Sequence, residues 1–141
     1  MKKQVLRFLG VLGLLLVAGS AFAQNIHVRA NIPFSFNVNK DTLPAGQYEV
    51  RTIDSVGGHL LVINNRQAGT REMFLTSAVS TSHAQADKGK LVFKRYGDQY
   101  FLSQIWLPDN ETGRELPQSA RERELVAGYA PTKVVVTAGL R

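Results

Sequence analysis

Residues 26–38 read IHVRANIPFSFNV, and this stretch decides the fold. From Ile26 to Val38 every second side chain is apolar, and the side chains between them are polar or proline. Alternation with a period of two predicts a β-strand with one buried face and one solvated face. Pro33 has no N–H for a strand ladder. We therefore expect it on an edge, at a bulge or where the strand bends from one sheet to another.

The residues that follow continue as short strands separated by turns. The turns are rich in glycine, proline and asparagine, and fall at residues 43–46, 54–58 and 64–69. We expect strands over residues 47–53, 60–63 and 71–79. The unbroken apolar run from 60 to 63 indicates a strand buried on both faces. On the strand over 71–79, Met73, Leu75 and Val79 are in register and form its apolar face.

The clearest hairpin is centred on Gly97-Asp98, a two-residue link that begins with glycine and suits a tight primed turn. The link joins strands expected over residues 90–96 and 99–107. It fixes a register that pairs Tyr96 with Gln99, Arg95 with Tyr100 and Phe93 with Leu102. Both faces of this hairpin are partly apolar, so we expect another element to cover its second side.

The hairpin also carries the candidate interaction surface. With strict alternation along both strands, Arg95, Tyr100 and Trp106 share one face. Arginine among aromatic rings is typical of binding hot spots. The simpler structural interpretation is that Trp106 packs in the core and Arg95 lies over it.

One short helix is expected near the C-terminus. Ser119 and Glu122 fit a capping box, which predicts a helix over residues 118–127. A closing strand over 132–137 could pair with the first strand and protect both edges. The fold class is therefore mainly β: an antiparallel β-sandwich or small β-barrel of about seven strands with one short helix.

Residues 1–23 have the layout of a bacterial signal peptide. Lys2 and Lys3 precede an apolar run that ends in Ala21-Phe22-Ala23, an Ala-x-Ala cleavage site. The uncharged core is shorter than the roughly 18–20 residues of a membrane-spanning helix. We expect cleavage after Ala23, a single β domain over 24–141, and a periplasmic or extracellular location. Contact with the membrane would come only through the leader.

Composition limits the function classes. The chain has no cysteine, so neither a disulfide nor a thiol nucleophile is available. Its formal net charge of +6 loses three positive charges with the leader, and the remaining basic residues are dispersed, which argues against nucleic acid as a partner.

No motif indicates a catalytic or cofactor site. His27, His59 and His83 lack the spacing of metal ligands. There is no Gly-x-Ser-x-Gly or Ser-x-x-Lys motif, and the carboxylates are scattered. We expect no catalytic residue, no metal and no cofactor.

Several motifs in a fixed order resemble a family of small exported acidobacterial proteins of unknown function. They are IPFSFNV (32–38), LPAGQYEV (43–50), FKRYGDQYFL (93–102), GRELP (113–117) and SAREREL (119–125). The resemblance implies a shared β-rich fold and an envelope or extracellular setting. It implies no activity and no catalytic residues.

The sequence thus predicts an exported non-enzymatic β domain that acts as a binding or structural module at the cell envelope. Its contact surfaces would be the Arg95 hairpin and the loops at 80–89 and 108–113. The first alternative is a small barrel that carries an apolar ligand in its interior. The second alternative is a hydrolase, which would need carboxylates or histidines gathered in a cleft.

Overall fold

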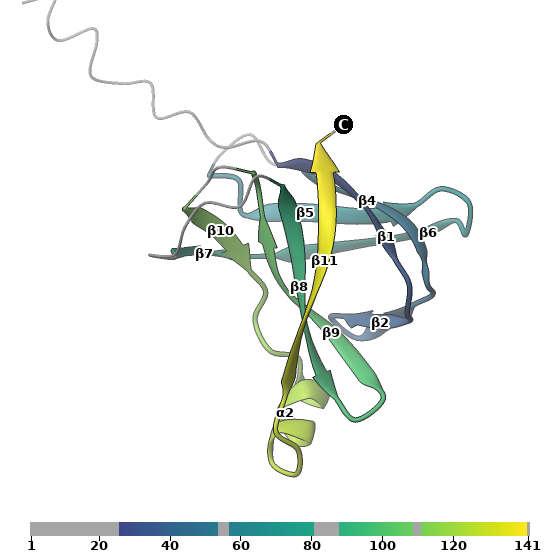
Figure 1. Cartoon of the computed structure of the whole chain (residues 1–141), viewed down its shortest axis with the longest axis vertical. Helices are drawn as coiled ribbons and strands as arrows, with labels where there is room; N and C mark the ends of the chain where they lie inside the picture. The colour runs from purple at the N-terminus through teal and green to yellow at the C-terminus, as the bar shows by residue number, and fades with distance from the viewer. Residues whose placement is uncertain (1–25, 54–56, 81–87, 109–110, 141) are drawn as a thin grey trace, which may run out of the picture.

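The structure is a computed structural model that describes residues 26–53, 57–80, 88–108 and 111–140. Within these ranges the chain is mainly β, with eleven strands and one short helix (Figure 1). The predicted leader, its cleavage site after Ala23, and most of the loop at 80–89 lie outside the described residues. The expected β class with one short helix is confirmed.

The strands are short. The N-terminal half holds β1 (His27–Ile32), β2 (Phe36–Val38), β3 (Asp41–Leu43), β4 (Gly46–Thr52), β5 (Leu60–Asn65) and β6 (Thr70–Leu75). The C-terminal half holds β7 (Ser77–Ser80), β8 (Gly89–Tyr96), β9 (Gln99–Trp106), β10 (Thr112–Glu115), the helix α2 (Ala120–Val126) and β11 (Thr132–Leu140). The expected number of about seven strands is too low, because two long predicted strands are split and short strands form in segments predicted as turns or loops.

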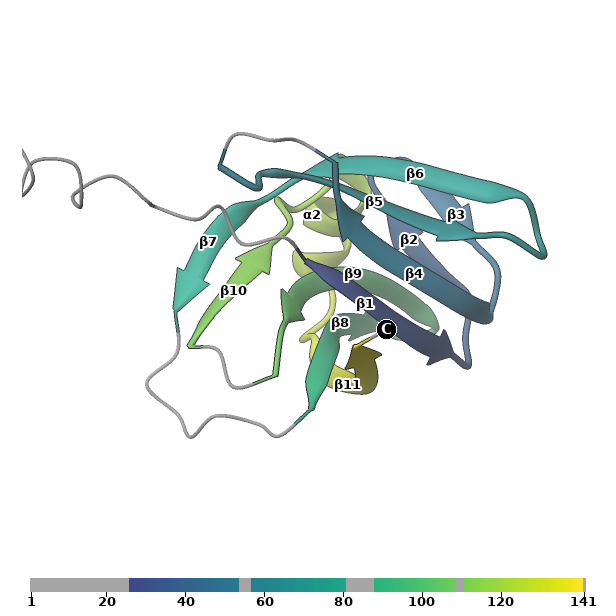
Figure 2. The same cartoon turned by 90° about the horizontal axis from the view of Figure 1, so that it is seen from above.

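The strands curl into one nearly closed barrel in the order β3-β2-β9-β8-β11-β1-β4-β5-β6 (Figures 1 and 2). Neighbouring strands are antiparallel, except that β2 and β9 are parallel. The last strand pairs with the first, with Val28 opposite Leu140, as the sequence suggested. Beyond β9, the strands β10 and β7 form a short ribbon at the side of the barrel.

The opening stretch forms a strand because its alternation matches the barrel wall. Val28 and Ile32 are fully buried, while Arg29 and Asn31 between them are exposed. Pro33 ends β1, and the chain then crosses to the other side of the barrel and continues as β2. Of the three positions expected for Pro33, the bend between two parts of the sheet is the one observed, and Phe36 returns to the core with 0% exposure.

Large side chains fill the barrel interior. The ring of Phe36 packs edge-on against Tyr48 and Phe93, with centroids 5.0 and 5.4 Å apart. The Tyr48 hydroxyl donates to the carbonyl oxygen of Pro44, so its polar end is satisfied. Around these rings lie fully buried aliphatic residues from six strands: Val28, Ile32, Val38, Val50, Leu61, Ile63, Leu91 and Ile105.

The central hairpin begins in the predicted register and then departs from it. Arg95 lies opposite Tyr100, and Phe93 lies opposite Leu102. Between Val92 and Phe93 the register shifts, so that Ser103 on β9 has no residue opposite it. This β-bulge adds one residue to β9. The β9 residues after Ser103 therefore point to the face opposite to the one that strict alternation predicts.

Trp106 therefore lies on the outer face of the barrel, and its predicted place beside Arg95 and Tyr100 is wrong. It is buried all the same, because β10 covers it. A Cβ atom on Gly113 would come within 2.6 Å of the indole ring, so only a glycine fits there.

The strand predicted over 71–79 also differs from expectation. It is split into β6 and β7 at Thr76, and Phe74 is the β6 residue that enters the core. Met73 and Leu75 are 53% and 65% exposed, so the face they form points outward. Leu61 and Phe74 are directly opposite each other and both are buried, so the next pair, Val62 and Met73, lies on the other face of the β5–β6 pair.

The helix α2 is shorter than predicted, and its cap is the predicted one. The Ser119 hydroxyl accepts a hydrogen bond from the Glu122 backbone N–H. The Glu122 side chain does not complete the capping box but accepts a hydrogen bond from the Tyr96 hydroxyl at 3.0 Å. This contact docks the helix on the second side of the hairpin, which was expected to be covered.

Asn39 joins the two ends of the strand order, which are β3 and β6. Its Nδ2 donates to the carbonyl oxygen of Met73 at 2.9 Å and to Oε1 of Glu72 at 3.1 Å. Its φ of 54° lies in the left-handed region, which asparagine tolerates better than most residues.

No helix in the described part of the chain has the length and apolar character needed to cross a bilayer.

Candidate functional site: a polar pocket on the barrel wall

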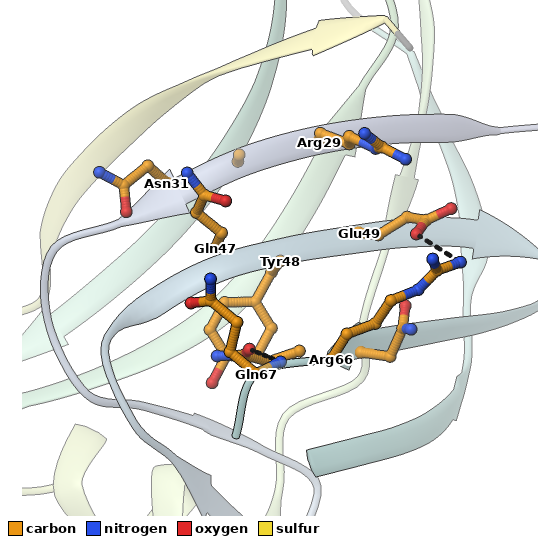
Figure 3. Close-up of a pocket in the computed structure, with 10 residues that line it drawn as sticks. Arg29, Asn31, Gln47, Tyr48, Glu49, Arg66 and Gln67 are labelled. Atoms are coloured by element: carbon orange, nitrogen blue, oxygen red, sulfur yellow. Dashed lines mark hydrogen bonds and ion pairs between the residues drawn. The ribbon is translucent and has the colours of Figure 1, made fainter. Parts of the chain in front are cut away.

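A pocket of about 510 Å³ lies on the outer face of β1, β4 and β5 and the β5–β6 turn (Figure 3). We call it the polar pocket, because most of its lining side chains carry amides or charges. They are Arg29, Ala30, Asn31, Gln47, Tyr48, Glu49, Asn64, Asn65, Arg66 and Gln67. Its volume is within the range of small-ligand sites in proteins.

Strand alternation supplies the pocket with its side chains. The same period that sends Val28 and Val50 into the core sends Arg29 and Glu49 outward, and these two outward residues are directly opposite each other. Hydrogen-bonded strands hold their backbone atoms in place. The pocket floor is therefore rigid, as a binding site requires.

The β5–β6 turn forms one wall. The Asn65 side-chain oxygen accepts hydrogen bonds from the backbone N–H groups of Gln67 and Ala68, at 3.0 and 3.1 Å. This local ring of bonds is an Asx-type turn. It holds Arg66 and Gln67 over the pocket, as Figure 3 shows.

Glu49 is the electrostatic centre of the pocket. Its Oε1 lies 2.5 Å from Nε2 of His27, and its Oε2 lies 3.9 Å from the Arg66 guanidinium. Burial raises the pKa of the Glu49 carboxyl group. The hydrogen bond with His27 and the nearby charges, including those of Arg29 and Arg66, outweigh burial and hold this pKa below its ordinary value of 4.5.

The amide side chains of the pocket are available to a ligand. Within the described residues, the side chains of Asn31, Gln47 and Gln67 form no hydrogen bond. The side-chain oxygen of Asn64 is buried and also lacks a partner there. Each amide offers two N–H donors and an acceptor oxygen, so the pocket can both give and receive hydrogen bonds.

The predicted interaction residues are only partly brought together. The Arg95 guanidinium lies 5.6 Å from the centroid of the Tyr100 ring, which stacks on Phe34 at 3.9 Å. Trp106 lies on the outer face, 5.7 Å from the Lys90 ammonium, and its N–H donates to Gln104. Arg95 and Tyr100 thus form one small cluster, and Trp106 belongs to another.

The two described histidines are held in separate ion or hydrogen-bond contacts. His27 pairs with Glu49, and Nδ1 of His59 lies 2.8 Å from a guanidinium nitrogen of Arg114. His83 lies outside the described residues. In the portion of the chain that the structure describes, no three potential metal ligands gather in one place.

A second hollow, of about 670 Å³, lies between the β2–β3 turn, β9 and the start of α2. Phe101 and Pro117 give it an apolar base, and Lys40, Arg121 and Arg123 line it with positive charge. These cations have no ion pair with a described residue. The polar pocket has the denser set of hydrogen-bonding groups and stands on strands instead of a turn and a short helix.

Sequence reasoning did not identify the polar pocket. Its residues were assigned to solvated strand faces and a turn, and each of them is unremarkable alone. The sequence does show that amides and arginines cluster on the outward positions of the first two long strands. These side chains form a pocket only because β1 pairs with β4 in the observed register.

Comparison of the chain with known protein families, with curated proteins and with solved structures finds no match.

Proposed function

We propose that this protein is an exported, non-enzymatic binding module of the bacterial cell envelope, and that the polar pocket is its main contact surface. The leader-like sequence at 1–23 motivates the export. The pocket motivates the binding role. The Arg95–Tyr100 cluster is a secondary contact at the end of the barrel.

One observation carries the proposal. A rigid sheet surface presents Arg29, Arg66 and Glu49 together with amides that have no hydrogen bonds to the described residues. Polar groups of this density can bind a polar ligand by many directional hydrogen bonds.

The carrier alternative is less well supported. A carrier needs an internal cavity, whereas side chains such as Phe36, Tyr48 and Phe93 occupy the middle of this barrel with at most 1% exposure. Native mass spectrometry of protein purified from the periplasm separates the two functions. A stoichiometric adduct of lipid mass would favour the carrier.

The binding role is tested by retention on isolated bacterial cell envelopes. We expect the protein without residues 1–23 to cosediment with the envelopes, and the Arg29→Gln/Arg66→Gln variant to lose most of this retention, by about fivefold or more. The matched control is Arg121→Gln/Arg123→Gln, which removes the same charge from α2. Equal loss in both variants, or no retention of the unmodified protein, would contradict the proposal.

A further inference from the structure

The outer wall of the barrel carries a pronounced excess of positive charge. Along β8, β11, β1, β4, the β5–β6 turn and β6, the outward positions include a set of cations that we call the basic face. Its members are Lys90, Lys94, Lys133, Arg29, Arg51, Arg66 and Arg71. In the described part of this face, Glu49 is the one carboxylate.

Strand pairing brings two of these cations together. Lys94 and Lys133 are directly opposite each other, although like charges in that position destabilise a sheet. Arg51 is opposite His27, and Arg71 is opposite Asn64 of the pocket wall. Like charges held opposite each other at a cost in stability are expected where an anionic partner binds.

The acidic residues lie elsewhere. The other described carboxylates lie in β3, in β6 beside Asn39, in the β8–β9 turn, just before β10, in β10 and in α2. They are Asp41, Glu72, Asp98, Glu111, Glu115, Glu122 and Glu124. On the outward positions of the basic face, the seven cations therefore outnumber Glu49, the one carboxylate among the described residues there.

We infer that the ligand is an acidic polysaccharide, a chain of hydroxyl-rich sugars with carboxylate groups, that lies along the basic face with one sugar unit in the polar pocket. This inference rests on the proposed binding function and specifies its ligand. Arg29 and Arg66 bind a sugar carboxylate, because a guanidinium matches a carboxylate with two parallel hydrogen bonds.

The remaining pocket groups fit the sugar hydroxyls. A hydroxyl both donates and accepts, and an amide side chain offers the complementary pair of groups. Asn31 and Gln47 are directly opposite each other on β1 and β4, so their amides face adjacent hydroxyls of one ring. Glu49 stays ionised and accepts from a hydroxyl at the edge of the pocket.

An anionic membrane is the competing partner for a basic surface. Met73 and Leu75 are exposed near Arg71, but they lie on β6, at the end of the strand order. The centre of the face is a pocket lined by amides, which would lose hydrogen bonds to water against a lipid surface. The observations therefore favour the polysaccharide.

Calorimetric titration tests the inference with polygalacturonate as the acidic polymer and dextran as the neutral one. We expect binding of polygalacturonate at low ionic strength, weakening as salt is added, and no measurable binding of dextran. Arg29→Gln/Arg66→Gln should weaken binding by about tenfold, which corresponds to roughly 1.4 kcal/mol. Arg121→Gln/Arg123→Gln should leave it within about twofold.

Two further probes separate the components of the inference. Inorganic polyphosphate carries charge without sugar hydroxyls, so it should bind more weakly than polygalacturonate. The Asn31→Ala/Gln47→Ala variant should bind polygalacturonate more weakly and should bind polyphosphate unchanged. An equal loss of binding to polygalacturonate and to polyphosphate in this variant would overturn the sugar assignment. Tighter binding to phosphatidylglycerol vesicles than to polygalacturonate would overturn it in favour of a membrane.

The outcomes also distinguish this inference from the proposed function. If envelopes retain the protein through Arg29 and Arg66 but polygalacturonate does not bind, the acidic polysaccharide is wrong and the binding module stands. If envelopes do not retain the protein either, both are wrong.

Discussion

Glu49 shows how a single residue can tune a surface. Its carboxylate lies among cations, and its side chain is 13% exposed, so water screens the interactions only partly. Because its pKa is lower in the folded chain than in the unfolded chain, ionised Glu49 stabilises the fold. That contribution is fully present above the unfolded value and is lost as the pH falls through the folded value.

We therefore expect the melting temperature of the Glu49→Gln variant to depend less on pH in the acid range than that of the unmodified protein. Between about pH 6 and about pH 3, the melting temperature of the unmodified protein should fall further than that of the variant, by about 2–4 °C. Circular dichroism at a series of pH values measures it. Glu111→Gln, at an exposed carboxylate, serves as the control, and an equally reduced pH dependence there would show that Glu49 is not the group responsible.

At the scale of the element, β9 shows what sequence can and cannot predict. The Gly97-Asp98 link was sufficient for the first half of the hairpin register, because a two-residue turn leaves one pairing. The bulge at Ser103 could not be foreseen, since serine has no special bulge preference and its backbone oxygen is stabilised by a distant residue, Leu116. One extra residue then moved Trp106 to the other face.

Deleting Ser103 tests the role of the bulge. Without it, Leu102 and Gln104 become neighbours that point to opposite faces, so Ile105 and Trp106 keep their present faces. The deletion removes the local bend and the carbonyl oxygen that accepts from the Leu116 N–H, and we expect a loss of about 1–3 kcal/mol in the free energy of unfolding. Ser103→Ala keeps the extra residue and should cost less than about 1 kcal/mol. Urea unfolding of both variants gives the comparison, and a deletion that costs no more than Ser103→Ala would mean that the bulge is dispensable.

The β6 strand shows a second limit of sequence. Met73, Phe74 and Leu75 are consecutive apolar residues, so alternation alone cannot tell which of them faces inward. Pairing with β5 decides it, because Leu61 is opposite Phe74 and both are buried. Where apolar and polar residues alternate cleanly, as in β1, the local pattern was sufficient.

At the scale of the whole molecule, the barrel is closed by a side chain instead of a strand pair. The sequence predicted the pairing of the first and last strands, but it contained no sign that Asn39 would link the β2–β3 turn to β6. That link joins residues far apart in the chain, and such contacts depend on the curvature of the whole sheet.

Asn39→Gly isolates this link, because glycine keeps the positive φ and removes only the side-chain donor. We expect the backbone amides of β6 to exchange with solvent about tenfold faster in the variant, while those of β8 and β9 are unchanged. Hydrogen exchange followed by NMR gives the residue-level rates. Uniform acceleration in all strands would instead indicate global destabilisation, and unchanged rates in β6 would show that the link does not hold the seam.

The contact between Gly113 and Trp106 gives the protein a built-in optical probe. The sequence contains one tryptophan, and its indole is shielded by β10 and not by the barrel interior. Its emission wavelength will therefore report whether the β7–β10 ribbon is seated, and a red shift that precedes the loss of β-sheet signal would reveal the ribbon detaching while the barrel remains folded.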